Sequence, residues 1–243
     1  SILKVSRRGA NAAVQLGKLP EADAMVARAE AAGEGATEGA AATELAEVAK
    51  VKAKIVSARA EAAQRELESK ARAHAEAATQ RAIKARGYAI GAWEDERLRE
   101  QCIGAAAGAR VWYDEEEDEV HWPLLLLYPE TAQSDFVQDL SERESLQPQL
   151  LEMFGECAEH APPWDTEQRY AVPRLAVYAP FLHRDTDAQS YVRVAIDEPL
   201  LPQLKRAQGL GYTIPGVPTL QVVVRESVYE GHFITPKMVA MPM

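Results

Sequence analysis

Cys157 and His160 are the residues whose types and spacing first suggest chemistry. Two residues separate them, as in many metal-ligand pairs, but a tetrahedral metal site needs two more ligands and none lies nearby in the sequence. Cys157 could also act as a nucleophile if a distant histidine activated it, and this alternative would make the chain a small enzyme. Neither pattern is complete, and we therefore predict no metal, no cofactor and no catalytic residue.

Other patterns typical of enzymes are also missing. Neither a GxSxG motif, a Walker-type glycine loop nor a GxGxxG motif occurs, so no nucleophile elbow or phosphate cradle is indicated. The acidic run Asp114–Glu119 lacks the glycine and the ligand spacing of a helix–loop–helix calcium site. His121, His183 and His232 lie in or beside expected strands, where a histidine is usually structural. The prediction is a protein that is not an enzyme.

Trp164 and Asp165, in the segment PPWD, are candidates for binding a protein partner. An exposed tryptophan next to prolines can anchor another protein, because aromatic side chains supply much of the energy of interfaces. The alternative is that Trp164 closes one end of the core. Trp122 is expected to pack inside the protein in a similar way.

The charge of the chain is unevenly distributed. Residues 1–110 contain 18 Lys and Arg against 15 Asp and Glu, whereas residues 111–243 contain 9 against 22. Such an acidic second half repels phosphate backbones, so we expect no nucleic-acid partner. Apolar runs are much shorter than the roughly 18 residues of a membrane span, so no membrane association is expected.

The start of the chain shows no secretory signal in SILKVSRRGANAAV. Two cysteines are too few for a disulfide framework, which fits a reducing compartment. We expect a cytoplasmic protein, with an additional nuclear pool as the alternative.

Residues 1–39 are expected to form two short helices. The first spans about Lys4–Gly17 and the second begins near Pro20, because proline is favoured in a first helical turn. The turn GKLPEA resembles that of a tetratricopeptide repeat, which contains about 34 residues. Small residues occupy the positions where two helices would cross: Gly9, Ala10, Ala13, Ala22 and Ala29.

Residues 40–104 are expected to form a long helical connector. Thr43 to about Arg99 is rich in Ala, Glu, Lys, Arg and Gln and contains no proline. Sustained heptads are absent, which favours a solvated helix over a coiled coil, although self-association through this helix is an alternative. Apolar residues mark one face early and then become rare: Leu45, Val48, Ile55, Val56, Leu67 and Ile83.

Residues 105–243 have the pattern of an α+β domain with one sheet and a few covering helices. The acidic run Asp114–Glu119 is expected to be the turn of a hairpin. Strands are predicted at Val111–Tyr113, Val120–Tyr128, Leu175–Tyr178, Tyr191–Ile196, Leu220–Val224 and Tyr229–Ile234. Helices are predicted at Ser134–Leu140, Ser145–Phe154 and Pro199–Gln208.

The segment HWPLLLLYPETAQSDF contains four consecutive leucines, Leu124–Leu127. A short apolar run between prolines is typical of a strand that is buried on both faces. Burial of four leucines stabilises a fold by roughly 6–12 kcal/mol, so the strand should lie centrally in the sheet. Ser134 or Asp135 is then expected to cap a helix that carries Phe136 and Leu140.

This segment and four others resemble a known family. HWPLLLLYPETAQSDF is similar to the opening of the C-terminal wheel domain of tetratricopeptide-repeat co-chaperones of heat-shock protein 90, the tetratricopeptide repeat protein four and cyclophilin-seven-suppressor group. The other segments agree in order: AIKARG at 82–87, LLEMFGE at 150–156, PPWDTEQRY at 162–170 and LAVY at 175–178. The segment CAEHA before Pro162 resembles a small insertion relative to this family.

The resemblance implies a fold and two site residues. The fold would be a terminal tetratricopeptide helix pair (1–39), a long connecting helix (40–104) and an α/β wheel domain with a central mixed sheet (105–243). In the family, a Lys and an Arg four residues apart in the third repeat help to hold the C-terminal carboxylates of the chaperones. This motif falls on Lys4 and Arg8, and with the first two repeats absent from the chain we expect an incomplete clamp with weak or no peptide binding.

The function implied by the resemblance is that of an adaptor. The repeat would recruit heat-shock protein 90, with heat-shock protein 70 as a second chaperone partner. The wheel domain would engage a client such as translation elongation factor two, and Trp164 and Asp165 are the candidate client-binding residues. The small enzyme with a helical appendage is the alternative from a different functional class.

Overall fold

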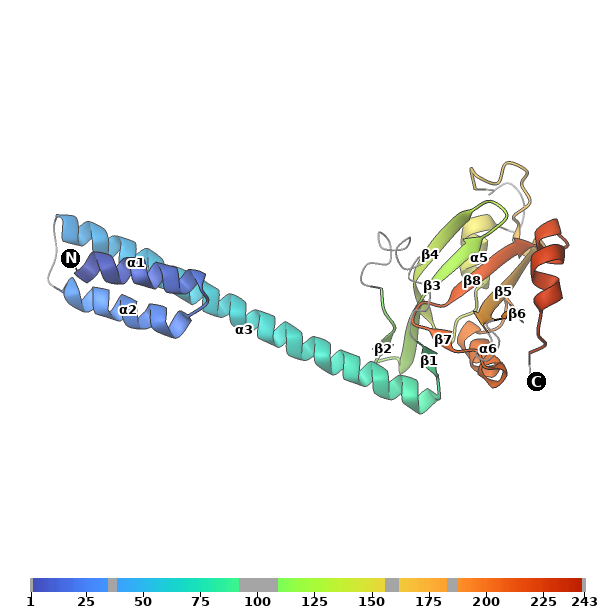
Figure 1. Ribbon diagram of the computed structural model, residues 1–243, viewed down its shortest axis with the longest axis horizontal. Helices are drawn as coiled ribbons and strands as arrows, with labels where there is room; N and C mark the ends of the chain where they lie inside the picture. Colours follow the sequence, from blue (N-terminus) through green and yellow to red (C-terminus); the bar gives the residue numbers. More distant parts are fainter. Residues whose placement is uncertain (1, 35–38, 92–108, 156–161, 183–187, 242–243) are drawn as a thin grey trace. The chain divides into compact units, whose positions relative to one another are not determined.

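Figure 1 shows the computed structural model, which describes residues 2–34, 39–91, 109–155, 162–182 and 188–241. The chain packs as two compact units, Ser1–His74 and Ala75–Met243, which we call the helical unit and the sheet unit. The predicted connector is thus divided between both units. Cys157, His160 and His183 lie outside the described residues. Within the described ranges, no helix has the length and apolar character that crossing a membrane requires.

The helical unit contains α1 (Ile2–Gln15), α2 (Leu19–Ala32) and the first part of α3 (Ala40–Arg86). Gly17, in the turn after α1, has a φ of 72°, a left-handed conformation that glycine adopts without steric cost. Pro20 lies in the first turn of α2, where its missing N–H is not needed. These observations confirm the predicted helix pair.

Small residues allow α1 and α2 to approach each other closely. A Cβ atom added at Gly9 would lie 2.7 Å from the Sδ atom of Met25, so a larger residue there would require the Met25 side chain to shift. The first part of α3 completes this core through Val48, Val51 and Ile55. The core from α1 and α2 consists of Ala10, Ala13, Ala22, Val26 and Ala29, which include four of the five predicted crossing positions.

The helix α3 ends at Arg86, and the predicted end at Arg99 is wrong. Gly87 follows with a φ of 70°, and its N–H donates to the carbonyl of Lys84 while the N–H of Tyr88 donates to Ile83. This left-handed glycine and the two bonds satisfy the last carbonyls and stop the helix. Further back along α3, Leu67 is 64% exposed, as expected for a solvated helix.

The sheet unit is built on a six-stranded mixed sheet. Five strands follow the order β2-β3-β8-β5-β6, and the sixth strand, β4, also pairs with β3. Pairing of β3 with β8 is parallel and the other pairings are antiparallel. A separate parallel pair joins β1 (Ile90–Gly91) to β7 (Ile214–Pro215). The strands of the main sheet are β2 (Trp112–Asp114), β3 (Glu119–Tyr128), β4 (Gln133–Ser141), β5 (Leu175–Leu182), β6 (Gln189–Val194) and β8 (Thr219–Val224).

The leucine run lies in β3, and the prediction of a central strand buried on both faces is confirmed. Leu124 and Leu126 are fully buried in the main core, whereas Leu125 faces the opposite side and contacts Val217. Trp122 is also fully buried in the main core, as expected. The predicted hairpin turn at the acidic run is present between β2 and β3.

The predicted helix at Ser134–Leu140 is wrong, because this segment forms the strand β4. It pairs antiparallel with β3 in a hairpin, with Leu127 opposite Ser134 and Leu124 opposite Val137. Ser134 and Asp135 therefore cap no helix. The long apolar strand β3 presents a row of backbone donors and acceptors, and satisfying them outweighs the weak helical pattern of this segment.

Two of the predicted helices cover the face of the sheet that contributes to the main core. They are α5 (Gln147–Phe154) and α6 (Leu200–Ala207), which contribute Leu150, Phe154 and Leu204 to the main core. The predicted strand at Tyr229–Ile234 is wrong, because Glu230–Ile234 forms a π-helical turn against the opposite face. The α+β class with a central mixed sheet is confirmed.

Candidate interaction sites

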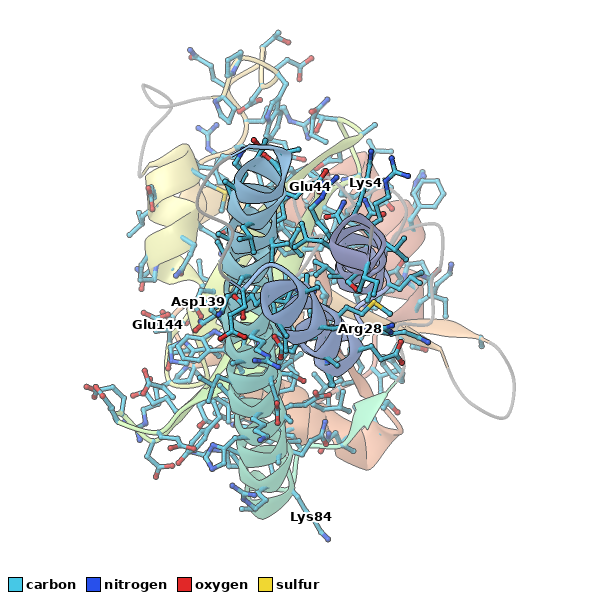
Figure 2. All side chains as sticks on the ribbon, turned by 90° about the vertical axis from the view of Figure 1, so that its left-hand side faces the viewer. Lys4, Arg28, Glu44, Lys84, Asp139 and Glu144 are labelled. Carbon is cyan, nitrogen blue, oxygen red and sulfur yellow. The ribbon has the colours of Figure 1, made fainter. Side chains whose placement is uncertain are left out.

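Lys4 and Arg8 lie on α1, one helical turn apart, and both side chains are exposed. The buried face of α1 is formed by Leu3, Ser6, Ala10 and Ala13, which recur at the spacing of one helical face. Lys4 and Arg8 each follow this buried stripe by one or two positions, so packing of the stripe orients both side chains toward solvent. Figure 2 shows Lys4 projecting from the outer side of α1.

Arg7, which lies between these two residues in the sequence, differs from them because it forms an ion pair. The Nε atom of Arg7 lies 2.7 Å from a carboxylate oxygen of Glu44 on α3. Seven cations of the helical unit form such pairs with carboxylates. Among the described residues of this unit, five cations have no carboxylate partner: Lys4, Arg8, Arg28, Lys54 and Arg72.

Of these five, Lys4 and Arg8 are the pair placed at positions i and i+4 on one helix. Two like charges at this spacing repel by roughly 0.2–0.5 kcal/mol, so the pair does not stabilise the helix. The guanidinium of Arg8 can bind a carboxylate through two parallel hydrogen bonds, and the ammonium of Lys4 can add a compact charge. The face is therefore suited to an anionic group supplied by another molecule.

Trp164 lies in an aromatic cluster in the sheet unit. Its ring stacks on Tyr128 with centroids 5.2 Å apart and meets Tyr170 edge-on at 5.0 Å, while Phe154 lies 6.0 Å away. Burial raises the pKa of the Tyr128 and Tyr170 hydroxyls well above the usual range of tyrosine. Trp164 remains half-buried, so it packs on the core and also reaches the surface.

Asp165 is buried and organises the loop that follows. Its carboxylate accepts hydrogen bonds from the backbone N–H groups of Arg169 and Tyr170, at 2.9 and 2.7 Å. These contacts give Trp164 and Asp165 structural roles, and a role in client binding stays a prediction. The cluster itself follows from the segment PPWD being placed against α5 and β3.

A polar junction at the end of α3 was not predicted from the sequence. The carboxylate of Glu142 accepts hydrogen bonds from Nε of Arg86 at 2.5 Å, the hydroxyl of Tyr88 at 2.7 Å and the backbone N–H of Val120 at 3.0 Å. Arg86 also donates to Asp118. Burial and the bond to Glu142 raise the pKa of the Tyr88 hydroxyl above its usual range.

This junction fastens the last turn of α3 to the hairpin β2–β3 and to the end of β4. Arg86 belongs to the segment AIKARG, and Glu142 directly follows the end of β4. However, the two residues are 56 positions apart, and nothing in their local patterns indicates that they meet.

The structure describes two of the histidines that were expected in or beside strands, His121 and His232. His121 stacks on Trp112 with ring centroids 4.2 Å apart, and its Nδ1 atom lies 2.8 Å from the carboxylate of Asp139. His232 lies in the π-helical turn near the C-terminus and is exposed. Over the residues that the structure describes, no group of three or more potential metal ligands comes together.

Comparison with known proteins gives one family match. The model of the "Cns1/TTC4 Wheel domain" matches residues 112–229. The chain is 35% identical to human "Tetratricopeptide repeat protein 4" over 136 residues, which are 51% of the chain and 33% of that protein. It is 34% identical over 102 residues to "Hsp70/Hsp90 co-chaperone cns1" of Schizosaccharomyces pombe, covering 42% of the chain and 26% of that protein.

One solved structure supports the fold of the chain. The "Hsp90 co-chaperone Cns1" from Saccharomyces cerevisiae superimposes with a TM-score of 0.58 at 16% identity, covering 97% of this chain and 70% of that one. At this identity the match shows a shared fold. The chain spans about a third or less of the length of the curated relatives it matches.

Proposed function

We propose, from the premise that this chain carries the Wheel domain of the Cns1/TTC4 family, that it belongs to a co-chaperone that brings heat-shock protein 90 and a client protein together. The relative from Schizosaccharomyces pombe is named an Hsp70/Hsp90 co-chaperone, and that name motivates the proposal. Heat-shock protein 70 is accordingly the second proposed chaperone partner. The proposed location is the cytoplasm, with an additional nuclear pool as the alternative.

The observation that carries the chaperone side is the pair of unpaired cations on α1. Lys4 and Arg8 are exposed and lack carboxylate partners among the described residues, whereas Arg7 between them is bound to Glu44. A C-terminal peptide with several carboxylates would supply the missing negative charge. One pair of cations is a small part of such a site, so binding by this chain should be weak.

The sheet unit is proposed to engage the client, with translation elongation factor two as the proposed client. Trp164 would present the exposed part of its ring, and Asp165 would hold the loop that carries it. The role is that of an adaptor without catalysis or cofactor. Holding two proteins on one chain raises their effective concentration relative to each other.

The test measures chaperone and client binding separately. An amide NMR titration with the acidic C-terminal peptide of heat-shock protein 90 should shift signals around Lys4 and Arg8, with a dissociation constant above about 100 μM. The double variant Lys4→Glu/Arg8→Glu should lose these shifts. Arg28→Glu/Lys54→Glu is the matched control, because it makes the same charge change at two other exposed, unpaired cations of the helical unit.

For the client, purified elongation factor two should co-precipitate with the chain and equally with both double variants. Absence of co-precipitation would contradict the client assignment while leaving the chaperone side intact. Peptide binding that survives in Lys4→Glu/Arg8→Glu would contradict the role of α1. Binding at low micromolar concentration would contradict the expectation of an incomplete clamp.

A further inference from the structure

Four cations of the sheet unit lie where α3 ends and α6 contacts it. The last turns of α3 carry Lys84 and Arg86, and the last turn of α6 carries Lys205 and Arg206. Arg86 and Arg206 are each paired with carboxylates, so Lys84 and Lys205 are the two cations of this group without an ion pair among the described residues. Figure 2 shows Lys84 projecting from the end of α3 away from the ribbon.

Two hollows lie here, and Tyr88 lines both. The first has a volume of about 510 Å³, with Ile83, Tyr88 and Ile90 as its apolar lining and Lys84 beside them. The second has a volume of about 370 Å³ and is lined by Tyr88, the two prolines Pro199 and Pro202, and charged residues that include Arg86 and Arg143. Because the half-buried Tyr88 lines both, the two hollows are adjacent.

Within the described part of the chain, the lysines beside these hollows have no carboxylate partner. Lys84 forms no ion pair among the described residues. The ammonium of Lys205 donates to the backbone carbonyl of Arg86 at 2.6 Å and lies 5.9 Å from the Tyr88 ring centroid, but it contacts no carboxylate in the described part of the chain. The one carboxylate that lines the second hollow, Glu142, is already bound by Arg86 and Tyr88.

We propose that the two hollows beside Tyr88 bind an extended acidic peptide segment of a partner protein, with its carboxylates facing Lys84 and Lys205. Apolar side chains of the segment would enter the hollows, one on the isoleucine side and one on the proline side of Tyr88. An extended peptide fits because side chains at positions i and i+2 point to the same face and can occupy two neighbouring hollows. Charge complementarity selects an acidic segment over a basic one.

This site is distinct from the face of α1. It uses residues of the sheet unit alone, and it stands or falls independently of the role proposed for Lys4 and Arg8. An acidic segment that binds here would give the sheet unit a recognition surface of its own. The attraction is electrostatic and exposed to solvent, so it should weaken as the salt concentration rises.

The test uses the 243-residue chain and a fluorescein-labelled acidic heptapeptide, EDLDLDE, followed by fluorescence polarisation. Lys84→Glu should weaken binding by about fivefold or more, because it replaces an attraction with a repulsion. Lys237→Glu is the matched control: it makes the same charge change at another exposed lysine of the sheet unit and should alter affinity by less than about twofold. The basic analogue KKLKLKK should not bind.

Two further variants separate the proposal from its alternatives. Pro202→Glu places a negative charge at the second hollow and should also weaken binding, at an exposed helix position that tolerates glutamate. Lys4→Glu/Arg8→Glu should leave the affinity unchanged, so a loss there would assign the peptide to α1 and overturn the proposal. Equal affinities of Lys84→Glu and Lys237→Glu, or no saturable binding below about 1 mM, would overturn it as well.

Discussion

The two units of this chain differ in how they use apolar residues. The helical unit has a core of alanine and valine with one isoleucine, because its helices cross closely. The sheet unit has a much larger core that includes the buried rings of Trp122, Tyr128 and Phe154. Larger side chains remove more apolar area from water, so the sheet unit should be the more stable of the two.

The two units also differ in how they use charge. In the helical unit, Lys4 and Arg8 are exposed and form no ion pair with the described residues, and the ion pair of Arg7 with Glu44 is partly exposed. In the sheet unit, Arg86 and Glu142 form a largely buried junction that also involves Tyr88. Both units thus combine an ion pair that fixes their own structure with exposed cations that a partner could bind, and the fixing pair is more buried in the sheet unit.

The largest effect is expected from Leu126→Ala in the core of the sheet unit. Leu126 is fully buried, and removing its side chain should lower the free energy of unfolding by about 3–5 kcal/mol. All four tryptophans lie between residues 93 and 164, so urea unfolding followed by tryptophan fluorescence reports on the sheet unit. Leu67→Ala is the control, since this exposed leucine should change stability by less than about 0.5 kcal/mol.

Equal stabilities of the two leucine variants would contradict the packing described for β3. The helical signal in circular dichroism should meanwhile show that the unfolding transition of the helical unit is unchanged in Leu126→Ala. A shift of both transitions together would show that the units unfold as one.

A smaller loss is expected from Glu142→Gln, which keeps the shape of the side chain and removes its charge. Arg86 would then keep only the more exposed carboxylate of Asp118, and the sheet unit should lose about 1–3 kcal/mol of stability. Arg143→Gln breaks the more exposed pair with Glu119 nearby and should cost less than about 1 kcal/mol. Urea unfolding of both variants, again read by tryptophan fluorescence, distinguishes a structural junction from an ordinary surface ion pair.

Much of this architecture can be predicted from local patterns. The helix pair follows from Gly17, Pro20 and the small residues at the crossing, and β3 follows from the leucine run between prolines. In each case the signal lies within a few residues of the element that it specifies. The positions of Lys4 and Arg8 on one helix face follow from the same local argument.

The errors occurred where distant residues decide the structure. Ser134–Leu140 contains a plausible cap and apolar spacing for a helix, but its pairing with β3 makes it a strand. The end of α3 was placed too late because the helix-forming composition continues past Gly87, although this glycine and the bonds around it stop the helix. The junction of Arg86 and Glu142 was missed because only the folded chain brings them together.

The smallest effect, and the sharpest test of the contrast in charge, concerns three neighbouring cations of α1. Arg7→Gln removes the pair with Glu44 and should lower the stability of the helical unit by about 0.2–1 kcal/mol. Lys4→Gln removes a repulsion from Arg8 and should raise it by about 0.2–0.5 kcal/mol. Thermal unfolding followed by circular dichroism at low salt can measure these opposite signs, and added salt should diminish both. A loss of stability in Lys4→Gln would mean that Lys4 serves the fold, because a residue kept free for a partner has no stabilising contact to lose.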